Sequence, residues 1–134
     1  MQATNLKTNH LSAPLGMDAG TLFLSWQCAG GVRQTAYEIE VTAGAGTLWT
    51  SGKVLGSGMH TETPAAVPPK TQGQWRIRLW DENDQPGAWS EAEFETGLAQ
   101  SDWQGVWVCP ETEEPDIDCA DAINAFAKPN WEQK

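Results

Sequence analysis

Three glutamates at alternating positions are the first candidates for acid–base chemistry. Glu91, Glu93 and Glu95 alternate with Ala92 and Phe94, the two-residue period of a β-strand, which places all three carboxylates on one face. No apolar residue lies between them on that face to raise a carboxyl pKa toward neutrality. We therefore expect a solvated strand face rather than the paired acid and base of an enzyme.

Metal-binding chemistry is no better supported. An acidic run near the C-terminus offers carboxylates but lacks the fixed glycine and terminal glutamate of an EF-hand loop. Its carboxylates are Glu111, Glu113, Glu114, Asp116 and Asp118. His10 and His60 each stand alone in a polar stretch, without the further ligands that a metal needs. We expect no metal and no cofactor, and we interpret the acidic run as a linker.

The cysteines Cys28, Cys109 and Cys119 are scattered and include no Cys-x-x-Cys pair, so they predict neither a zinc site nor a disulfide framework. Cys28 ends an apolar run and is expected to be a small buried side chain. Cys109 and Cys119 could pair across the acidic run. The first ten residues carry no secretory signal, so we expect a cytoplasmic protein, in which such a disulfide is disfavoured.

Eight tryptophans in 134 residues suggest carbohydrate binding, because indole faces stack on sugar rings. Trp26 and Trp75 are expected to fill a core instead. Trp49, Trp80 and Trp89 are the candidates for sugar contact. Three interpretations of them stay open: sugar stacking, packing or a cation–π contact with an arginine inside the domain, and an interface with other domains.

The segment Gln74–Asp81 must position several of these residues. Read with a period of two, it places three apolar residues on one face and two arginines and a tryptophan on the other. The apolar face holds Trp75, Ile77 and Leu79, and the other face holds Arg76, Arg78 and Trp80. This pattern predicts a central strand with one face in a core and one face toward water.

Six further segments are the expected partners of this strand. Glycine and proline separate them at intervals of roughly a dozen residues, and no segment before residue 120 has a convincing helical period. They are Thr4–Thr8, Leu22–Cys28, Gln34–Val41, Thr47–Val54, His60–Thr63 and Ala88–Thr96. Seven short strands of this kind predict an all-β fold, an antiparallel sandwich of the immunoglobulin or fibronectin type III kind.

Length and charge restrict the partners. A chain of 134 residues predicts one domain with some tail to spare. The net charge of -10, from 18 acidic and 8 basic residues, repels phosphate groups, so neither nucleic acid nor an anionic membrane surface is an expected partner. No apolar run approaches the ~20 residues of a membrane-spanning helix.

The sequence changes character after Gly97. We expect a sandwich over residues 1–108, and over residues 109–134 an irregular, truncated linker leading to a next domain, with a short helix at Asp121–Ala127. The apolar residues near this boundary are Trp103, Val106 and Trp107. We expect them to mark an interface with the following domain, and an isolated chain could form a homodimer through them.

Six motifs occur in a fixed order along the chain. They are Leu11–Met17, Leu24–Trp26, Gln34–Val41, Leu48–Val54, Trp75–Asp81 and Trp89–Gly97. In this order they resemble the N-terminal fibronectin type III-like domain of bacterial α-L-rhamnosidases, a class of glycoside hydrolases. The departures are at Thr50, where those domains often carry aspartate, and at Gly73 and Gln74, where they often carry aromatic residues.

The resemblance implies a non-catalytic module that packs on other domains of the same polypeptide. In such enzymes a separate α/α-barrel domain removes terminal non-reducing α-L-rhamnose from glycosides. The carboxylates responsible lie far downstream, so no catalytic residue carries over to this chain. Two alternatives stay open: a carbohydrate-binding module for rhamnose-containing glycosides, and a protein–protein interaction domain that binds through an edge strand or a loop tip.

Overall fold

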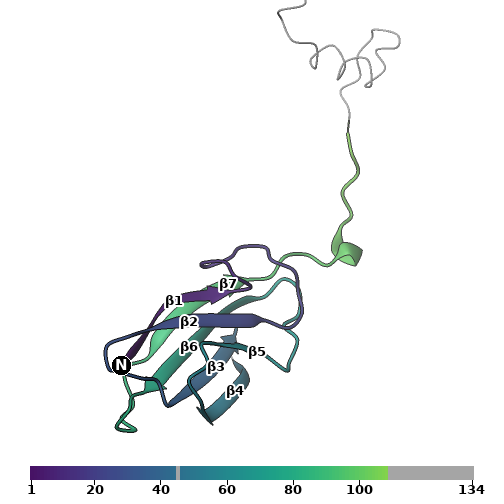
Figure 1. Cartoon of the computed structure of the whole chain (residues 1–134). Helices are drawn as coiled ribbons and strands as arrows, with labels where there is room; N and C mark the ends of the chain where they lie inside the picture. The colour runs from purple at the N-terminus through teal and green to yellow at the C-terminus, as the bar shows by residue number, and fades with distance from the viewer. Residues whose placement is uncertain (45, 109–134) are drawn as a thin grey trace, which may run out of the picture. The chain divides into compact units, whose positions relative to one another are not determined.

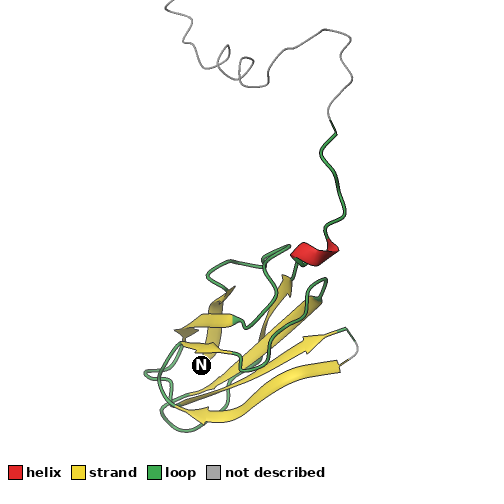
Figure 2. Cartoon of the chain, turned by 90° about the vertical axis from the view of Figure 1, so that its right-hand side faces the viewer, coloured by secondary structure: helices red, strands yellow, loops and turns green. Residues whose placement is uncertain are grey.

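The computed structural model describes residues 1–44 and 46–108. They form seven strands in two sheets that face each other (Figures 1 and 2). The strands are β1 (Gln2–Thr8), β2 (Phe23–Ala29), β3 (Ala36–Ala43), β4 (Gly46–Leu55), β5 (His60–Glu62), β6 (Gln72–Trp80) and β7 (Ser90–Glu95), and the 3₁₀ turn η1 (Gln100–Asp102) follows them. All of these elements belong to residues 1–104, one of two compact units of the chain.

The strand order confirms the predicted all-β sandwich. One sheet has the order β1-β2-β5 and the other has the order β4-β3-β6-β7, and every pairing within them is antiparallel. In the part of the chain that the structure describes, no helix is long and apolar enough to cross a membrane. The seven strands lie where the sequence pattern places them, to within a few residues at the ends.

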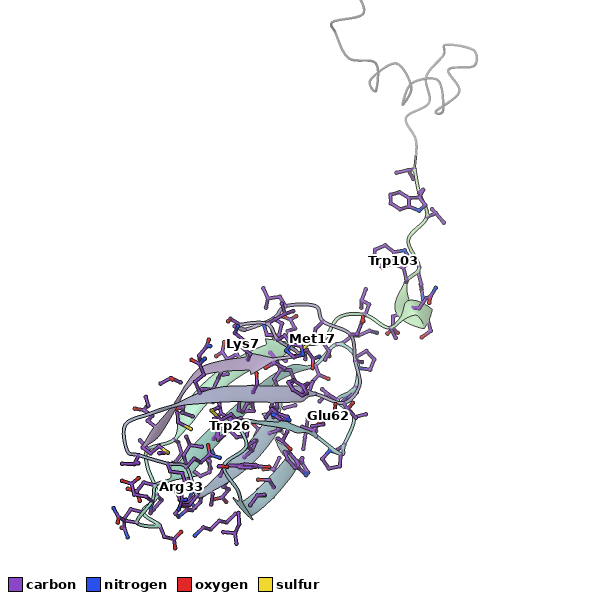
Figure 3. All side chains as sticks on the ribbon, in the orientation of Figure 1. Lys7, Met17, Trp26, Arg33, Glu62 and Trp103 are labelled. Carbon is purple, nitrogen blue, oxygen red and sulfur yellow. The ribbon has the colours of Figure 1, made fainter. Side chains whose placement is uncertain are left out.

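Alternation along β6 builds the core, as predicted. Trp75, Ile77 and Leu79 are fully buried, and they lie between β3 and β7 in the middle of the four-stranded sheet. The opposite sheet contributes Leu24 and Trp26 to the same cluster (Figure 3). Burying an aromatic or aliphatic side chain of this size stabilises the fold by about 1.5–3 kcal/mol, so this interface between the sheets carries most of the hydrophobic stabilisation.

A buried hydrogen bond joins the two sheets across the core. The indole Nε1 of Trp75 donates to Thr8 Oγ1 over 2.9 Å, and both residues are almost fully buried. An indole N–H that lost this acceptor would have no water to replace it, at a cost of about 1–3 kcal/mol. Thr8 therefore fixes the end of β1 over β6.

Gly73 and Phe94 form a complementary pair on the inner face of the sheet. They are opposite each other in β6 and β7, and a Cβ atom added at Gly73 would lie only 2.2 Å from Cζ of Phe94. The ring, which is 3% exposed, thus fills the space that a side chain at position 73 would need. Glycine at position 73 therefore leaves the room that the Phe94 ring occupies.

Several expectations concern residues outside the described part of the chain. They are the acidic linker with its five carboxylates, the Cys109–Cys119 pair and the helix at Asp121–Ala127. The boundary between residues 108 and 109 likewise stays a prediction.

Candidate functional site

The outer face of the four-stranded sheet carries a continuous stack of cations and indoles. Arg78 lies over both Trp80 and Trp89, with its Cζ 4.9 Å and 4.8 Å from the two ring centroids. Lys53 Nζ lies 4.8 Å from the Trp80 ring, and Arg76 Cζ lies 4.4 Å from the Trp89 ring. We call these five residues the cation–π stack. Each such contact is worth about 0.5–1 kcal/mol at an exposed site.

Two cross-strand ion pairs hold the arginines of the stack in place. Arg76 and Arg78 are directly opposite Glu40 and Glu38 in the register of β6 and β3. The Nε atom of each arginine donates to a carboxylate oxygen of its glutamate over 2.8 Å, and a second nitrogen of each also contacts that carboxylate. Opposite charges that face each other directly on one side of a sheet stabilise the pairing, so these two ion pairs help to join β3 to β6.

The three candidate tryptophans for sugar contact do not share one face. Trp80 and Trp89 belong to the cation–π stack, and Trp80 is only 7% exposed. Trp49 is opposite Val41 in β4 and β3, so it lies on the inner face, where it packs against the core. Trp80 and Trp89 make the cation–π contacts that one of the three interpretations expected. The three indoles do not form a single row.

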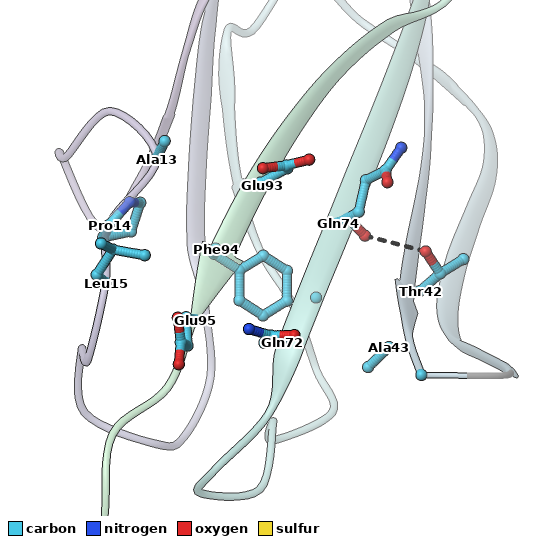
Figure 4. Close-up of a pocket in the computed structure, with 12 residues that line it drawn as sticks. Ala13, Pro14, Leu15, Thr42, Ala43, Gln72, Gln74, Glu93, Phe94 and Glu95 are labelled. Atoms are coloured by element: carbon cyan, nitrogen blue, oxygen red, sulfur yellow. Dashed lines mark hydrogen bonds between the residues drawn. The ribbon is translucent and has the colours of Figure 1, made fainter.

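The carboxylates of β7 line three hollows at the surface, and two of these lie around Glu95. Figure 4 shows Glu93 and Glu95 beside the Phe94 ring, in a hollow of about 380 Å³ whose other residues include Gln72 and Gln74. A larger hollow of about 750 Å³ shares Gln72 and Glu95 with it. Neither offers a nucleophile with a base beside it, and no group of three or more potential metal ligands occurs among the described residues.

Apolar side chains are exposed where the chain leaves the sandwich. Trp103 follows η1 and is 69% exposed (Figure 3), and Leu98 before η1 is 56% exposed. In the short described part of the second unit, Val106 is 82% and Trp107 is 99% exposed. Trp103, Val106 and Trp107, but not Leu98, are the residues that were expected at an interface with a following domain. We call Trp103, Val106 and Trp107 the exit residues.

An ion pair fixes the 3₁₀ turn that precedes the exit residues. Lys70 Nζ lies 3.0 Å from Asp102 Oδ1, and the Ala99 N–H donates to Asp102 Oδ2 over 3.1 Å. Both interactions favour the ionised carboxyl, the lysine more strongly, and hold the pKa of Asp102 below its ordinary value. The orientation of Trp103 thus depends on contacts of the sandwich itself.

The buried side chain of Gln34 makes four hydrogen bonds that the sequence pattern did not predict. Its Oε1 accepts from Trp26 Nε1 over 3.0 Å and from the Cys28 thiol over 3.2 Å, and its Nε2 donates to the carbonyls of Gly56 and Gly58. Cys28 is partly buried rather than fully buried as expected, and this burial raises the pKa of its thiol. The sequence pattern gave no signal of this role, because it placed Gln34 inside the predicted strand Gln34–Val41, whereas β3 begins at Ala36.

The two histidines are closer to each other than the sequence indicates. His10 and His60 both stack on Phe23, with ring centroids 4.7 Å and 5.5 Å from it. The three rings come from a turn, from β2 and from β5, on the outer face of the three-stranded sheet. Because Phe23 separates the imidazoles, the arrangement does not bring them together on one ion.

The comparisons with known proteins agree on a family. A family model described as the Rha78A-like, N-terminal immunoglobulin domain matches residues 3–100. The α-L-rhamnosidase of Streptomyces avermitilis is 34% identical over 134 aligned residues, which cover 88% of this chain and 13% of that enzyme.

Solved structures give the same result. The α-L-rhamnosidase from Dictyoglumus thermophilum superposes with a TM-score of 0.71 at 29% identity, over 78% of this chain and 13% of that one. The Streptomyces avermitilis α-L-rhamnosidase, solved in complex with L-rhamnose, superposes with a TM-score of 0.64 at 32% identity. The match covers 77% of this chain and 11% of that one. The chain thus spans only about an eighth of the length of these relatives. Because the family model covers nearly the whole sandwich, the chain belongs to the family of N-terminal immunoglobulin domains of Rha78A-like α-L-rhamnosidases.

Proposed function

We propose that this domain is a non-catalytic structural module of an α-L-rhamnosidase, which packs on neighbouring domains of the same polypeptide. The enzyme that carries it would remove terminal non-reducing α-L-rhamnose from glycosides with residues outside this domain. The observation that carries the proposal is the exposure of the exit residues at the point where the chain leaves the sandwich. Exposed tryptophans of this kind are typical of an interface rather than of a free surface.

The modest size of this apolar group fits an intramolecular interface. A domain that is covalently attached to its partner needs little interface area, because the linker keeps the effective concentration high. Interfaces between domains of one chain are accordingly more polar than those of permanent oligomers. On the sandwich itself, Trp103 and Leu98 on either side of η1 would supply apolar surface to such a contact.

The geometry of the cation–π stack favours packing over sugar binding. Trp80 and Trp89 each already contact two cationic side chains, so a pyranose ring would have to displace a lysine or an arginine to reach the indole face. Arg76 and Arg78 are also held by their glutamates. These contacts support a role of the stack in ordering β6 and β7.

A titration of the 134-residue chain with L-rhamnose, followed by tryptophan fluorescence, tests the non-binding part of the proposal. We expect no saturable change at millimolar sugar, and no release of rhamnose from an aryl α-L-rhamnoside. Saturable quenching that Trp89→Ala abolishes and the inner-face variant Trp49→Phe retains would replace the proposal with a carbohydrate-binding module. Hydrolysis by the purified chain would refute the non-catalytic assignment.

A further inference from the structure

The outer edge of β7 makes backbone hydrogen bonds at only one of its two ends. The Glu95 N–H donates to the Pro14 carbonyl over 2.9 Å, and the Glu95 carbonyl accepts from the Met17 N–H over 3.0 Å. At the other end, Ser90 Oγ donates to the carbonyl of Ala3 in β1 over 2.7 Å. Between these two contacts lies the stretch Glu91–Glu93.

The alternation of an antiparallel ladder fixes where the backbone groups of this stretch point. Since both polar groups of Glu95 face away from β6, those of Glu93 and Glu91, two and four residues earlier, face the same way. No backbone hydrogen bond occupies these two N–H and two C=O groups in the part of the chain that the structure describes. They form an open ladder segment, the kind of edge that accepts another strand.

A groove runs beside this open segment. It has a volume of about 610 Å³ and lies between β7 and β1. Its apolar lining comes from Ala3, Leu6, Ala13 and Ala92, of which Leu6 and Ala92 are partly buried and pack against the core. Glu91 and Glu93 line it on the outer side. Arg76 is directly opposite Glu91 in β6 but is paired with Glu40, and neither Glu91 nor Glu93 forms an ion pair among the described residues.

We propose that the β7 edge binds an extended peptide segment with the pattern basic–apolar–basic. In an added strand, the residues opposite Glu91 and Glu93 point outward beside the two carboxylates, and the residue between them points inward toward Ala92 and Leu6. Lysine or arginine suits the two outer positions and a small aliphatic residue suits the inner one. The main-chain groups of Glu91 and Glu93 supply the hydrogen bonds of strand addition.

A second copy of this chain fits the edge poorly. Two β7 edges in antiparallel contact would place the glutamates of one copy opposite those of the other, and like charges directly opposite each other destabilise a strand pair. The same carboxylates attract a basic strand. The proposal does not rest on the proposed function, because it concerns the edge of β7 and not the exit residues.

The test is a titration of the ¹⁵N-labelled 134-residue chain with the blocked peptide Thr-Lys-Val-Lys-Thr, followed by amide chemical shifts. We expect saturable shifts centred on the amides of residues 91 and 93, which weaken as salt is added. The peptide Thr-Glu-Val-Glu-Thr is expected to leave these amides unchanged. No saturable shift at millimolar peptide, or equal shifts with the acidic peptide, would overturn the proposal, as would shifts centred elsewhere.

Variants separate the contribution of charge to peptide binding from the contribution of the backbone hydrogen bonds. Glu93→Gln is expected to weaken binding about two- to fivefold, the range for one cross-strand charge pair. Glu93→Pro removes the outward N–H without touching the ladder to β6, which an edge position tolerates, and is expected to abolish binding. Glu62→Gln on β5 is the matched control and should bind as the wild type does. If Glu62→Gln weakened binding as much as Glu93→Gln, the site assignment would be wrong.

Discussion

Substituting alanine for Gly73 tests the packing of the core more sharply than any other single change. The added Cβ would lie 2.2, 2.6 and 2.8 Å from three atoms of the Phe94 ring, well inside the 3.4–4 Å of ordinary contact. Gly73 does not have a positive φ, so alanine suits the backbone and the whole cost arises from the ring. Phe94 is 3% exposed, so moving the ring away from position 73 would disturb its buried packing.

The expected cost follows from these contacts. Overpacking a well-packed core typically costs about 1–3 kcal/mol, and expelling the ring altogether would cost about 3–5 kcal/mol, the range for deleting a buried phenylalanine. Alanine also lowers the conformational entropy of the unfolded chain relative to glycine, which offsets about 0.4–1 kcal/mol of this cost. We therefore expect Gly73→Ala to lower the free energy of unfolding by about 2–4 kcal/mol, measured by urea denaturation with tryptophan fluorescence.

Two further variants identify the cause of that loss. In a Phe94→Leu background, Gly73→Ala should cost less than about 1 kcal/mol, because the smaller side chain leaves room; the difference is the coupling energy of the pair. Gly58→Ala is the matched control, since a Cβ there meets nothing within 4 Å. An unchanged urea midpoint for Gly73→Ala would refute the reasoning. So would an equal loss of unfolding free energy with and without the Phe94 ring.

Three other predictions follow from single contacts. Thr8→Val should lower the free energy of unfolding by about 1–3 kcal/mol, because it strands the buried Trp75 N–H, whereas Thr8→Ser should retain most of it; urea denaturation of both checks this. Lys70→Met should raise the pKa of Asp102 toward its ordinary value, measured by carboxyl NMR. Since the folded state lowers that pKa, the ion pair stabilises at neutral pH and is lost as pH falls through the folded-state pKa; a pKa that did not move would show that the lysine is not the main cause. Arg78→Met should expose both indoles of the cation–π stack and shift their fluorescence to longer wavelength, with a stability loss of about 1–2 kcal/mol; an unchanged spectrum would contradict the stack.

The alternation of residues made most of the fold predictable. In Gln74–Asp81 the period of two assigned Trp75, Ile77 and Leu79 to the core, and the structure confirms each one. The same reasoning placed the glutamates of β7 on the outer face. Strand periodicity works here because one face of each sheet is buried, so a shift by one residue would reverse every side chain.

The pattern could not predict which side chains of different strands contact each other. The burial of Trp80 depends on Lys53, which reaches it from β4, and the register that brings them together is set by pairing rather than by local sequence. Gln34 is a similar case, because it binds four partners from two segments, β2 and the loop that follows β4. The open edge at Glu91 and Glu93 likewise follows only from the bond that Pro14 makes with Glu95.

The central claim, a structural module that packs through the exit residues, is tested most directly in the full-length rhamnosidase that would carry this domain. The variant Trp103→Ser/Trp107→Ser is compared with Val32→Ser, which alters a side chain that is 88% exposed. The account predicts a melting temperature lower by several degrees for the double variant alone, with the KM for rhamnosides unchanged. A double variant as stable as the control would contradict packing through these residues, and a raised KM at unchanged stability would assign them to substrate binding instead.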